Sequence, residues 1–205
     1  MSYKTIRNRT EASFTEKKSE FIGYISPAGT EEEAIGFINE IRAMHRKATH
    51  NCYAYILRNN NTGRHSDDGE PGGTAGMPIY DVLSKNGITD VVCVVTRYFG
   101  GILLGTGGLV HAYSKGASMA LANAEIVNME VADSLKISCD YTMYGILNSV
   151  LPEFESIIRD TEFTDSVCIY ADVKTELTGS LTAKLIDRCN GKVKIEKLKS
   201  GYVEF

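Results

Sequence analysis

The residues best suited to chemistry lie in the stretch RYFGGILLGTGG, which begins at Arg97. Five glycines follow within a short span: Gly100, Gly101, Gly105, Gly107 and Gly108. Glycine tolerates positive φ and leaves backbone N–H groups open to close approach. A helix that starts where such a loop ends attracts anions through its unpaired N–H groups and its macrodipole. With the donors of Arg97 beside it, the stretch predicts an anion-binding loop.

A purely structural interpretation of this loop stays open. The glycines would then only permit close strand-to-helix packing, and Arg97 would pair with a nearby carboxylate. The spacing from Gly100 to Gly105 matches the start of a P-loop, but Thr106 stands where the lysine belongs. The dinucleotide fingerprint does not fit either, so neither standard nucleotide site is predicted.

A second cluster of polar residues is the loop RHSDDGEPGGTAGMP, which carries Asp67, Asp68 and Glu70. Oxygen ligands suit Mg²⁺, but the spacing lacks the alternating ligands and distal glutamate of an EF-hand, and a surface turn is favoured. Cysteines and histidines show no zinc-ligand spacing, so neither a metal nor a cofactor is expected. His50 can act as a general base, although a histidine opening an apolar strand is more often structural.

Buried elements must position these residues. The continuous run Val91–Val95 predicts a central strand covered on both faces, paired with a strand at His50–Leu57. A helix is expected from Thr106, with Thr106 as its cap. Its predicted apolar stripe is Val110, Tyr113, Ala117, Ala120 and Ala124.

The flanking segments complete a first domain. An antiparallel hairpin is expected from Tyr3–Ser13 and Glu20–Ser26, followed by a helix from the capping box Thr30–Glu33 to about His45. Its predicted stripe is Ala34, Phe37, Ile38, Ile41 and Met44. The loop that carries Asp67, Asp68 and Glu70, which we call the acidic segment, is predicted to have no helix or strand. It leads to a helix whose first turn contains Pro78.

From about Ser134 the pattern predicts the order βαββαβ, which is the ferredoxin-like split βαβ arrangement. In the last strand, Leu198 breaks the alternation of Val193 and Ile195, so a bulge or a change of exposed face is expected near Glu196–Lys197. The boundary is placed near residues 130 to 135, which gives an α+β chain with domains 1–132 and 133–205.

Composition limits the function classes. With 205 residues, 43% hydrophobic and 23% charged, the chain is an ordinary soluble one. No signal peptide or membrane-length apolar run is seen, which predicts a cytoplasmic protein with reduced cysteines. The net charge of −4 argues against coating nucleic acid by bulk electrostatics, but a local basic face is compatible with it.

Three motifs, HNCYAY at His50, DDGEPGGTAG at Asp67 and RYFGGILLGTGGLVHAY at Arg97, resemble the YigZ/IMPACT family over most of residues 1 to 130. The trailing unit looks like the second domain of bacterial members. The resemblance implies a first domain like domain 2 of ribosomal protein S5 and a second like the last domain of translation factor G. Eukaryotic relatives act in translational stress control by competing for the activator of a kinase.

The resemblance also implies the site. Its residues are His50, Asp67, Asp68, Glu70, Arg97, Tyr98, Gly100, Gly101, Gly105, Thr106, Gly107 and Gly108. Where relatives commonly carry Lys or Arg, this chain has His111, which lacks their permanent charge. The leading hypothesis is a non-enzymatic RNA- or ribosome-associated protein, in which the loop and Arg97 contact phosphate and Tyr98 or Phe99 stacks on a base.

Two alternatives remain. One is an enzyme or binder that acts on a small phosphorylated molecule, with Mg²⁺ held by the acidic loop opposite Arg97. The other is a protein-interaction module in translational stress control that recognises its partner through an exposed acidic loop.

Overall fold

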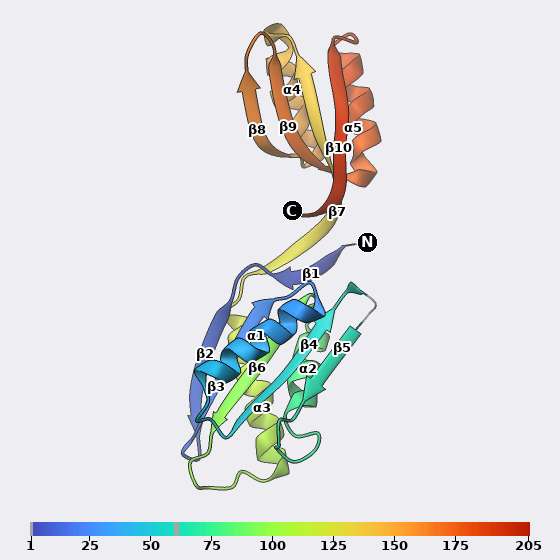
Figure 1. The fold of residues 1–205 in the computed structure, drawn as a ribbon. Helices are drawn as coiled ribbons and strands as arrows, with labels where there is room; N and C mark the ends of the chain where they lie inside the picture. The colour runs from blue at the N-terminus through green and yellow to red at the C-terminus, as the bar shows by residue number, and fades with distance from the viewer. Residues whose placement is uncertain (1, 60–61) are drawn as a thin grey trace. The chain divides into compact units, whose positions relative to one another are not determined.

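The computed structural model describes residues 2–59 and 62–205 and contains ten strands, five α-helices and two short 3₁₀ helices in those ranges (Figure 1). In chain order they are β1 (Tyr3–Ile6), β2 (Thr10–Glu16), β3 (Ser19–Pro27), α1 (Glu31–Met44), β4 (His50–Leu57), β5 (Thr62–Ser66), α2 (Gly76–Lys85), β6 (Val91–Tyr98), α3 (Thr106–Ala122), β7 (Ile126–Cys139), η2 (Tyr141–Met143), α4 (Tyr144–Val150), η3 (Leu151–Phe154), β8 (Ile157–Phe163), β9 (Val167–Lys174), α5 (Thr175–Arg188) and β10 (Val193–Glu204).

The chain divides into two compact units, which we call the first unit (Tyr3–Val127) and the second unit (from Asn128 onward). The strand β7 begins in the first unit and continues through most of the second-unit sheet. The boundary expected between residues 132 and 133 lies within this strand, so it stays a proposal about domain organisation. The fold is α+β with antiparallel sheets.

The first unit is built on an antiparallel sheet in the order β2-β3-β6-β4-β5. Its central strand is β6, and Val91 to Val95 are all fully buried. The register pairs His50 with Arg97 and Tyr55 with Val92, which confirms that β4 is the neighbour of β6. The predicted central strand is therefore confirmed.

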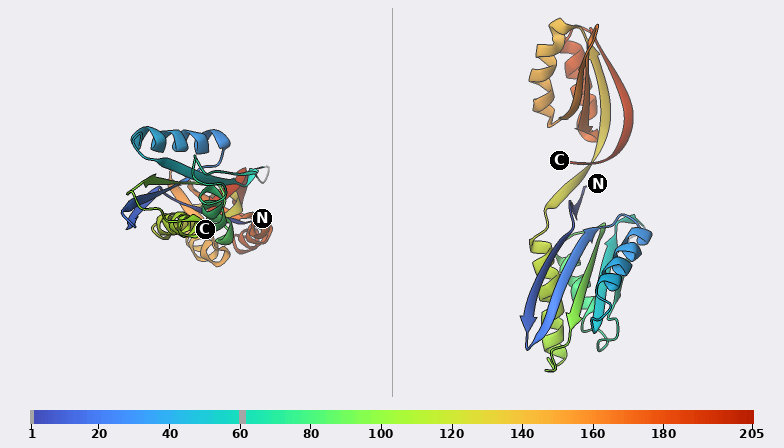
Figure 2. Two further views of the ribbon diagram at one scale, coloured as in Figure 1. Left: turned by 90° about the horizontal axis from the view of Figure 1, so that it is seen from below. Right: turned by 60° about the vertical axis from the view of Figure 1, so that its left-hand side comes forward.

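Apolar side chains of β6 alternate between two clusters, one on each face of this sheet. Val92 and Val94 pack with the buried residues of α1, whereas Val91, Cys93 and Val95 pack with α2 and α3. Figure 2 shows α1 on one face and α2 with α3 on the other. The strand is β-branched at most positions because both of its faces are covered.

Local signals in the first unit are partly confirmed. Thr30 and Glu33 form the expected capping box at the start of α1. Met44 is 60% exposed and Val110 is 39% exposed, so their placement in the buried stripes is wrong. The segment Thr62–Ser66 forms the edge strand β5 where loop was expected, because its polar residues sit on an exposed edge that does not require an apolar face.

The second unit has the element order βαββαβ as expected, with an antiparallel sheet in which β10 pairs with β7, β7 with β9 and β9 with β8. A cluster of buried residues from β7, β9, α4 and α5 forms its core. The register of β10 shifts between Lys197 and Lys199, which confirms the predicted bulge.

At the bulge, Asp133 is 2% exposed and accepts hydrogen bonds from Ser200 (2.7 Å) and Thr178 (2.9 Å), with Lys197 Nζ at 2.8 Å. The buried carboxylate therefore connects the bulged strand β10 to the start of α5.

Candidate functional site

The glycine loop joins β6 to α3 at one end of the first unit, and most of its residues are exposed. Gly100 packs directly on the β2–β3 turn, because a Cβ there would lie 1.9 Å from the Lys18 carbonyl oxygen. Gly101 and Gly105 have φ of 83° and 75°, the left-handed region that favours glycine. The loop therefore needs glycine for its conformation and its close approach to the hairpin, yet it remains accessible.

Helix α3 begins with open N–H groups. Its N-cap is Gly105, so Thr106 is the first helical residue and not the cap, which corrects the expectation from sequence. The positive φ of Gly105 places the helix start at that residue. No side chain caps this end and no acidic residue lies in the first turn. Thr106 and Gly107 are exposed, so the N-terminus of the helix faces outward.

Arg97 is buried, with only 5% of its surface exposed. Its Nη1 donates to Glu70 Oε1 at 2.7 Å, and the Tyr113 hydroxyl donates to the same oxygen at 2.7 Å. A weaker contact joins its Nη2 to Ser19 Oγ at 3.4 Å. Among the described residues, Arg97 Nε is the buried side-chain polar atom without a hydrogen-bond partner. The guanidinium thus has a carboxylate partner, and one of its nitrogens, Nε, is buried without a partner.

Glu70 and Arg97 bring the two sequence clusters together. Both line a cavity of about 430 Å³ beneath the glycine loop. The full lining is Thr49, His50, Gly69, Glu70, Pro71, Arg97, Phe99, Leu103, Leu104, Gly105, Thr106 and Leu109. The acidic segment and the glycine loop therefore meet at one cavity.

The acidic segment is not an exposed acidic surface, which corrects that expectation. Glu70 is 8% exposed. The Asp67 carboxylate accepts three backbone N–H groups, from Gly73, Ala75 and Gly76, at 2.8 to 3.0 Å.

Burial opposes ionisation of Asp67, but these three hydrogen bonds bring its pKa below the usual value.

Asp68 is also held internally. Its carboxylate accepts from the Asn51 backbone N–H at 2.7 Å and from Arg42 Nη2 at 2.8 Å. With Glu70 already paired to Arg97, all three carboxylates organise the protein's own backbone and side chains. Among the described residues no cluster of three or more His, Cys, Asp or Glu side chains has a metal-binding arrangement.

His50 lies beside the ion pair of Arg97 and Glu70, and one of its ring nitrogens has a fixed hydrogen-bond role. Its Nδ1–H donates to the carbonyl oxygen of Asp68 at 2.8 Å, since a carbonyl can only accept. Its Nε2 lies 3.9 Å from Glu70 Oε1, too far for a hydrogen bond. His50 therefore lines the cavity with its Nδ1–H already used inside the protein.

Tyr98, Phe99 and His111 occupy different surroundings. The Tyr98 hydroxyl lies 2.9 Å from His45 Nδ1, which places this residue toward α1. Phe99 is 44% exposed, and its ring lies 5.2 Å from the Arg97 guanidinium carbon. His111 is exposed on α3 and is not among the residues that line the cavity.

Two residues that the sequence analysis did not assign to the site, Tyr113 and Ser19, contact its buried ion pair. Tyr113 was expected only as a core residue, yet it also holds Glu70. A tyrosine in a stripe otherwise made mostly of alanine was the available signal. Ser19 contacts both Arg97 and the Gly100 N–H, and no local pattern pointed to it.

Basic side chains surround the start of the glycine loop. Lys17 and Lys18 form the β2–β3 turn against Gly100, and Arg46 and Lys47 follow α1 near Thr49, whose hydroxyl accepts from the Phe99 N–H. We call these four residues the basic rim. All four are exposed, and none makes an ion pair with any residue in the described part of the chain.

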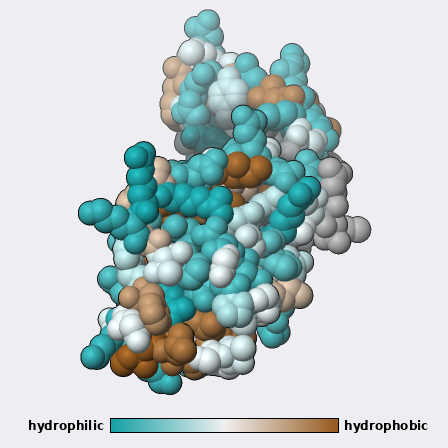
Figure 3. All heavy atoms as spheres, turned by 60° about the horizontal axis from the view of Figure 1, so that its bottom comes forward, coloured by the Kyte–Doolittle hydropathy of each residue, from teal (hydrophilic) through white to brown (hydrophobic). Residues whose placement is uncertain are grey.

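This end also exposes apolar side chains. Leu103 is 81% exposed and Ile102 is 41% exposed. Figure 3, which brings this end of the first unit forward, shows apolar residues grouped on the surface. Apolar and basic groups therefore lie together on the surface around the loop.

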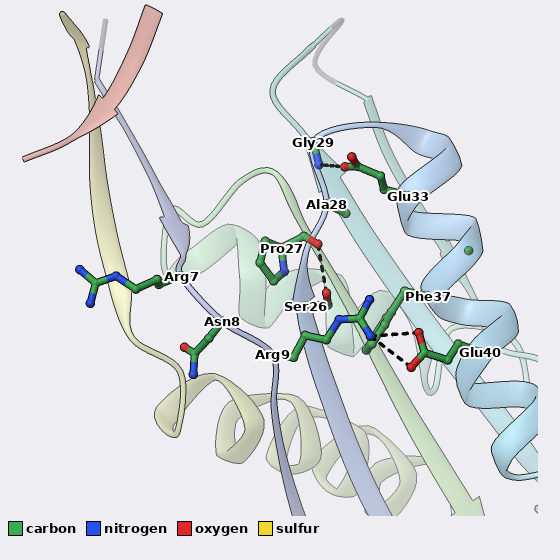
Figure 4. A pocket seen from close by; sticks show the side chains of 11 residues that line it. Arg7, Asn8, Arg9, Ser26, Pro27, Ala28, Gly29, Glu33, Phe37 and Glu40 are labelled. Atoms are coloured by element: carbon green, nitrogen blue, oxygen red, sulfur yellow. Dashed lines mark hydrogen bonds and ion pairs between the residues drawn. The ribbon is translucent and has the colours of Figure 1, made fainter. Parts of the chain in front are cut away.

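A second cavity in the first unit, of about 680 Å³, lies between α1 and the segment that follows β1 (Figure 4). Arg9 spans it, pairing with Glu40 at 3.0 Å and lying 5.0 Å from the centre of the Phe37 ring. Glu33 accepts from the Gly29 N–H as part of the helix cap. The helix terminus at this cavity is thus capped, whereas the N-terminus of α3 is open, so we place the candidate site at the glycine loop.

None of the described helices is both long and apolar enough to cross a membrane. The fold and the site define a two-unit α+β protein with a ligand-sized cavity between an exposed glycine loop and a buried Arg–Glu pair. Comparison with known families then assigns the chain. It belongs to the IMPACT family: residues 17–121 match the Impact N-terminal domain, and residues 137–192 match a domain of unknown function (DUF1949).

Similar proteins cover nearly the whole chain. The IMPACT family member YvyE of Bacillus subtilis is 37% identical over 204 residues, which cover 99% of this chain and 94% of that protein. The IMPACT family member YigZ of Escherichia coli is 32% identical, covering 87% of this chain and 89% of that protein. A crystal structure of a hypothetical protein matches with a TM-score of 0.63 at 29% identity, covering 97% and 98% of the two chains.

Proposed function

We propose that this protein is a non-enzymatic, translation-regulatory binding protein whose first unit contacts RNA of the translation machinery at the glycine-loop end. The observation that carries the proposal is the basic rim, whose four exposed cations have no ion-pair partner in the described chain. Such cations attract backbone phosphate, and the four of them outnumber the two carboxylates that flank the β2–β3 turn, Glu16 and Glu20. Membership of the IMPACT family supports a role linked to translation.

In this proposal the exposed Phe99 ring supplies a stacking surface for an unpaired base. The open N–H groups at Thr106 and Gly107 are available to phosphate oxygens. Arg97 has a different role from the one expected in the sequence. Because Glu70 holds its Nη1, Arg97 supports the loop and does not reach outward.

The test is ribosome cosedimentation of the full chain at increasing salt, with Lys17→Ala/Lys18→Ala as the variant. Each phosphate contact contributes a slope of about −0.7 to −0.9 in log affinity against log salt, so the variant should bind more weakly with a slope shallower by about 1.5. The matched control is Lys192→Ala/Lys199→Ala in the second unit, which removes the same charge from two exposed lysines. Salt-independent binding, or equal effects of both variants, would contradict the proposal.

A protein partner at the same end is the second candidate, favoured by the exposure of Leu103. Under this alternative, capture of a partner should survive nuclease treatment and salt, and Leu103→Ser should abolish it. Loss of capture after nuclease treatment would favour RNA.

We also propose the finer fold assignments. The element order of the second unit and the antiparallel pairs β10–β7, β7–β9 and β9–β8 support a ferredoxin-like fold resembling the last domain of translation factor G. The family membership supports a first domain like domain 2 of ribosomal protein S5. Solving the two domains separately, as 1–132 and 133–205, would test these assignments and the proposed boundary.

A further inference from the structure

We propose that the second unit binds an arginine-rich segment of a protein partner on an exposed group of aromatic side chains. The group consists of Tyr141, Tyr144 and Phe163, which we call the aromatic surface. It belongs entirely to the second unit. The inference therefore goes beyond the RNA contact proposed for the first unit and does not rest on it.

The three rings come from different elements and are held together by contacts within the unit. Tyr141 belongs to η2, Tyr144 is the first residue of α4, and Phe163 is the last residue of β8. The Phe163 ring stacks on the Tyr141 ring with 6.4 Å between their centres, and it meets the Tyr144 ring edge-on at 5.3 Å. The Tyr141 hydroxyl donates to the carbonyl oxygen of Thr164 at 2.6 Å. The fold therefore fixes this surface.

Two of these rings are open to solvent. Tyr141 is 53% exposed and Phe163 is 55% exposed, whereas Tyr144 packs against the core of the unit. Neighbouring aromatic side chains that stay exposed are typical of protein interaction surfaces, in which Tyr and Phe are enriched. The aromatic surface is therefore suited to contact a protein.

The aromatic surface lacks the cations that other rings of this unit have. Three other rings each have a lysine ammonium 5.5 to 5.7 Å from their centre: those of Phe154, Tyr170 and Phe205. In the described part of the chain, no Lys or Arg lies over a ring of the aromatic surface in this way. Because the face of an aromatic ring attracts a cation within about 6 Å, the exposed rings can accept the cation of a partner.

The charge beside the aromatic surface is negative. Asp140 directly precedes Tyr141, and Asp165 directly follows Thr164, which holds the Tyr141 hydroxyl. Both aspartates are exposed, and neither forms an ion pair with any residue that the structure describes. The segments 140–150 and 160–170 contain four acidic residues and no basic one. Charge complementarity therefore favours a cationic partner over RNA.

Arginine matches the rings and the carboxylates together. Its guanidinium is planar, stacks on aromatic faces and pairs with a carboxylate through two parallel N–H groups. A lysine ammonium is a compact, strongly hydrated charge without this geometry. A segment with several arginines can place one guanidinium on the exposed rings and another on Asp140 or Asp165. The expected partner is thus a protein with an arginine-rich segment.

The probes are acetyl-Gly-Arg-Gly-Arg-Gly-Arg-amide and its neutral counterpart with citrulline in place of arginine, titrated into the ¹⁵N-labelled full chain. Citrulline keeps the size and planarity of arginine but lacks its charge. Binding is followed through the amide signals of Tyr141, Gly145 and Asp165. The arginine peptide should shift these signals saturably, with at least tenfold higher affinity than the citrulline peptide. Equal affinities would overturn the requirement for a cation, and the absence of a saturable shift would overturn the site.

Two variants locate the binding. Tyr141→Leu/Phe163→Leu keeps the surface apolar but removes two aromatic faces, and protected amides in β9 and α5 would show that the unit stays folded. Asp140→Asn/Asp165→Asn removes two charges at nearly constant side-chain size. Each variant should weaken binding of the arginine peptide at least fivefold.

The matched control is Glu32→Gln/Asp187→Asn, which removes the same charge from two exposed carboxylates elsewhere and should bind normally. Equal weakening by this control would overturn the site, because binding would then follow net charge alone. Shifts of the same signals with protein concentration would assign the surface to a second copy, and larger shifts with oligouridylate would assign it to RNA. Either result would overturn the proposal. Lys17→Ala/Lys18→Ala should leave peptide binding intact, so this proposal and the RNA contact fail independently.

Discussion

Replacing Glu70 by leucine should destabilise the first unit by about 3–5 kcal/mol, the cost of leaving a buried charge without its partner. Glu70 is 8% exposed and Arg97 5% exposed, so water cannot take over the lost interaction. One carboxylate oxygen accepts both Arg97 Nη1 and the Tyr113 hydroxyl at 2.7 Å. The substitution therefore removes the acceptor from two buried donors at once.

Two further variants separate the contribution of the Tyr113 hydrogen bond from that of the ion pair between Glu70 and Arg97. Tyr113→Phe removes one hydrogen bond to a charged group and should cost about 1.5–3 kcal/mol. The double variant Glu70→Leu/Arg97→Met removes both charges, so it should cost much less than the sum of the two single changes. This non-additivity distinguishes a buried ion pair from two unrelated packing positions.

Amide hydrogen exchange measured by mass spectrometry suits this two-unit chain, because it reports each unit separately. Peptides from β6 and α3 should exchange faster in Glu70→Leu by about two to three and a half orders of magnitude, since about 1.4 kcal/mol corresponds to a factor of ten. Peptides from β9 and α5 in the second unit serve as the internal control. A loss of protection below tenfold in β6, or additive effects in the double variant, would refute the argument.

Two other predictions concern the core and the bulge. Burial alone would raise the pKa of Asp133, but hydrogen bonds from Lys197, Ser200 and neighbouring threonines lower it to about 2, from 3.8. The stability that ionised Asp133 gives to the second unit is therefore fully present above about pH 4 and is lost as the pH falls toward 2. Asp133→Asn should remove this acid-dependent loss in unfolding experiments on the second unit, and parallel pH profiles for both proteins would contradict it. Gly23→Ala should destabilise the first unit by about 1–3 kcal/mol, because the new Cβ would lie 2.3 Å from the Gly116 carbonyl oxygen. Gly36→Ala in α1, with nothing within 4 Å, is the control and should stabilise the helix by up to about 1 kcal/mol; equal melting shifts would disprove the contact argument.

Local and periodic features could be predicted because neighbouring residues determine them. The β-branched run at Val91 indicated a strand covered on both faces, and Thr30 with Glu33 indicated a capping box. The break in alternation at Leu198 marked the bulge in β10. Each depends on a backbone period or on residues a few positions apart.

Other features could not be predicted, because the residue types in a segment did not show whether that segment is an edge strand or a loop, or whether its charged side chains are buried. The strand β5 was missed because Gly63, Arg64 and His65 look like loop residues, although an exposed edge accommodates them. Glu70 was assigned to a surface turn because carboxylates are rarely buried without a partner. Its partner, Arg97, lies 27 residues further along the chain.

The sequence by itself therefore determined most of the helices and strands and the glycine loop that joins the buried strand β6 to α3. Only the tertiary structure decided that Glu70 lies against Arg97, that the Tyr113 hydroxyl donates to the same carboxylate, and that Glu70 and Arg97 both line a cavity. The physical reason is that the burial of a charge depends on acceptors and donors brought from distant parts of the chain. No local pattern records which of them will meet.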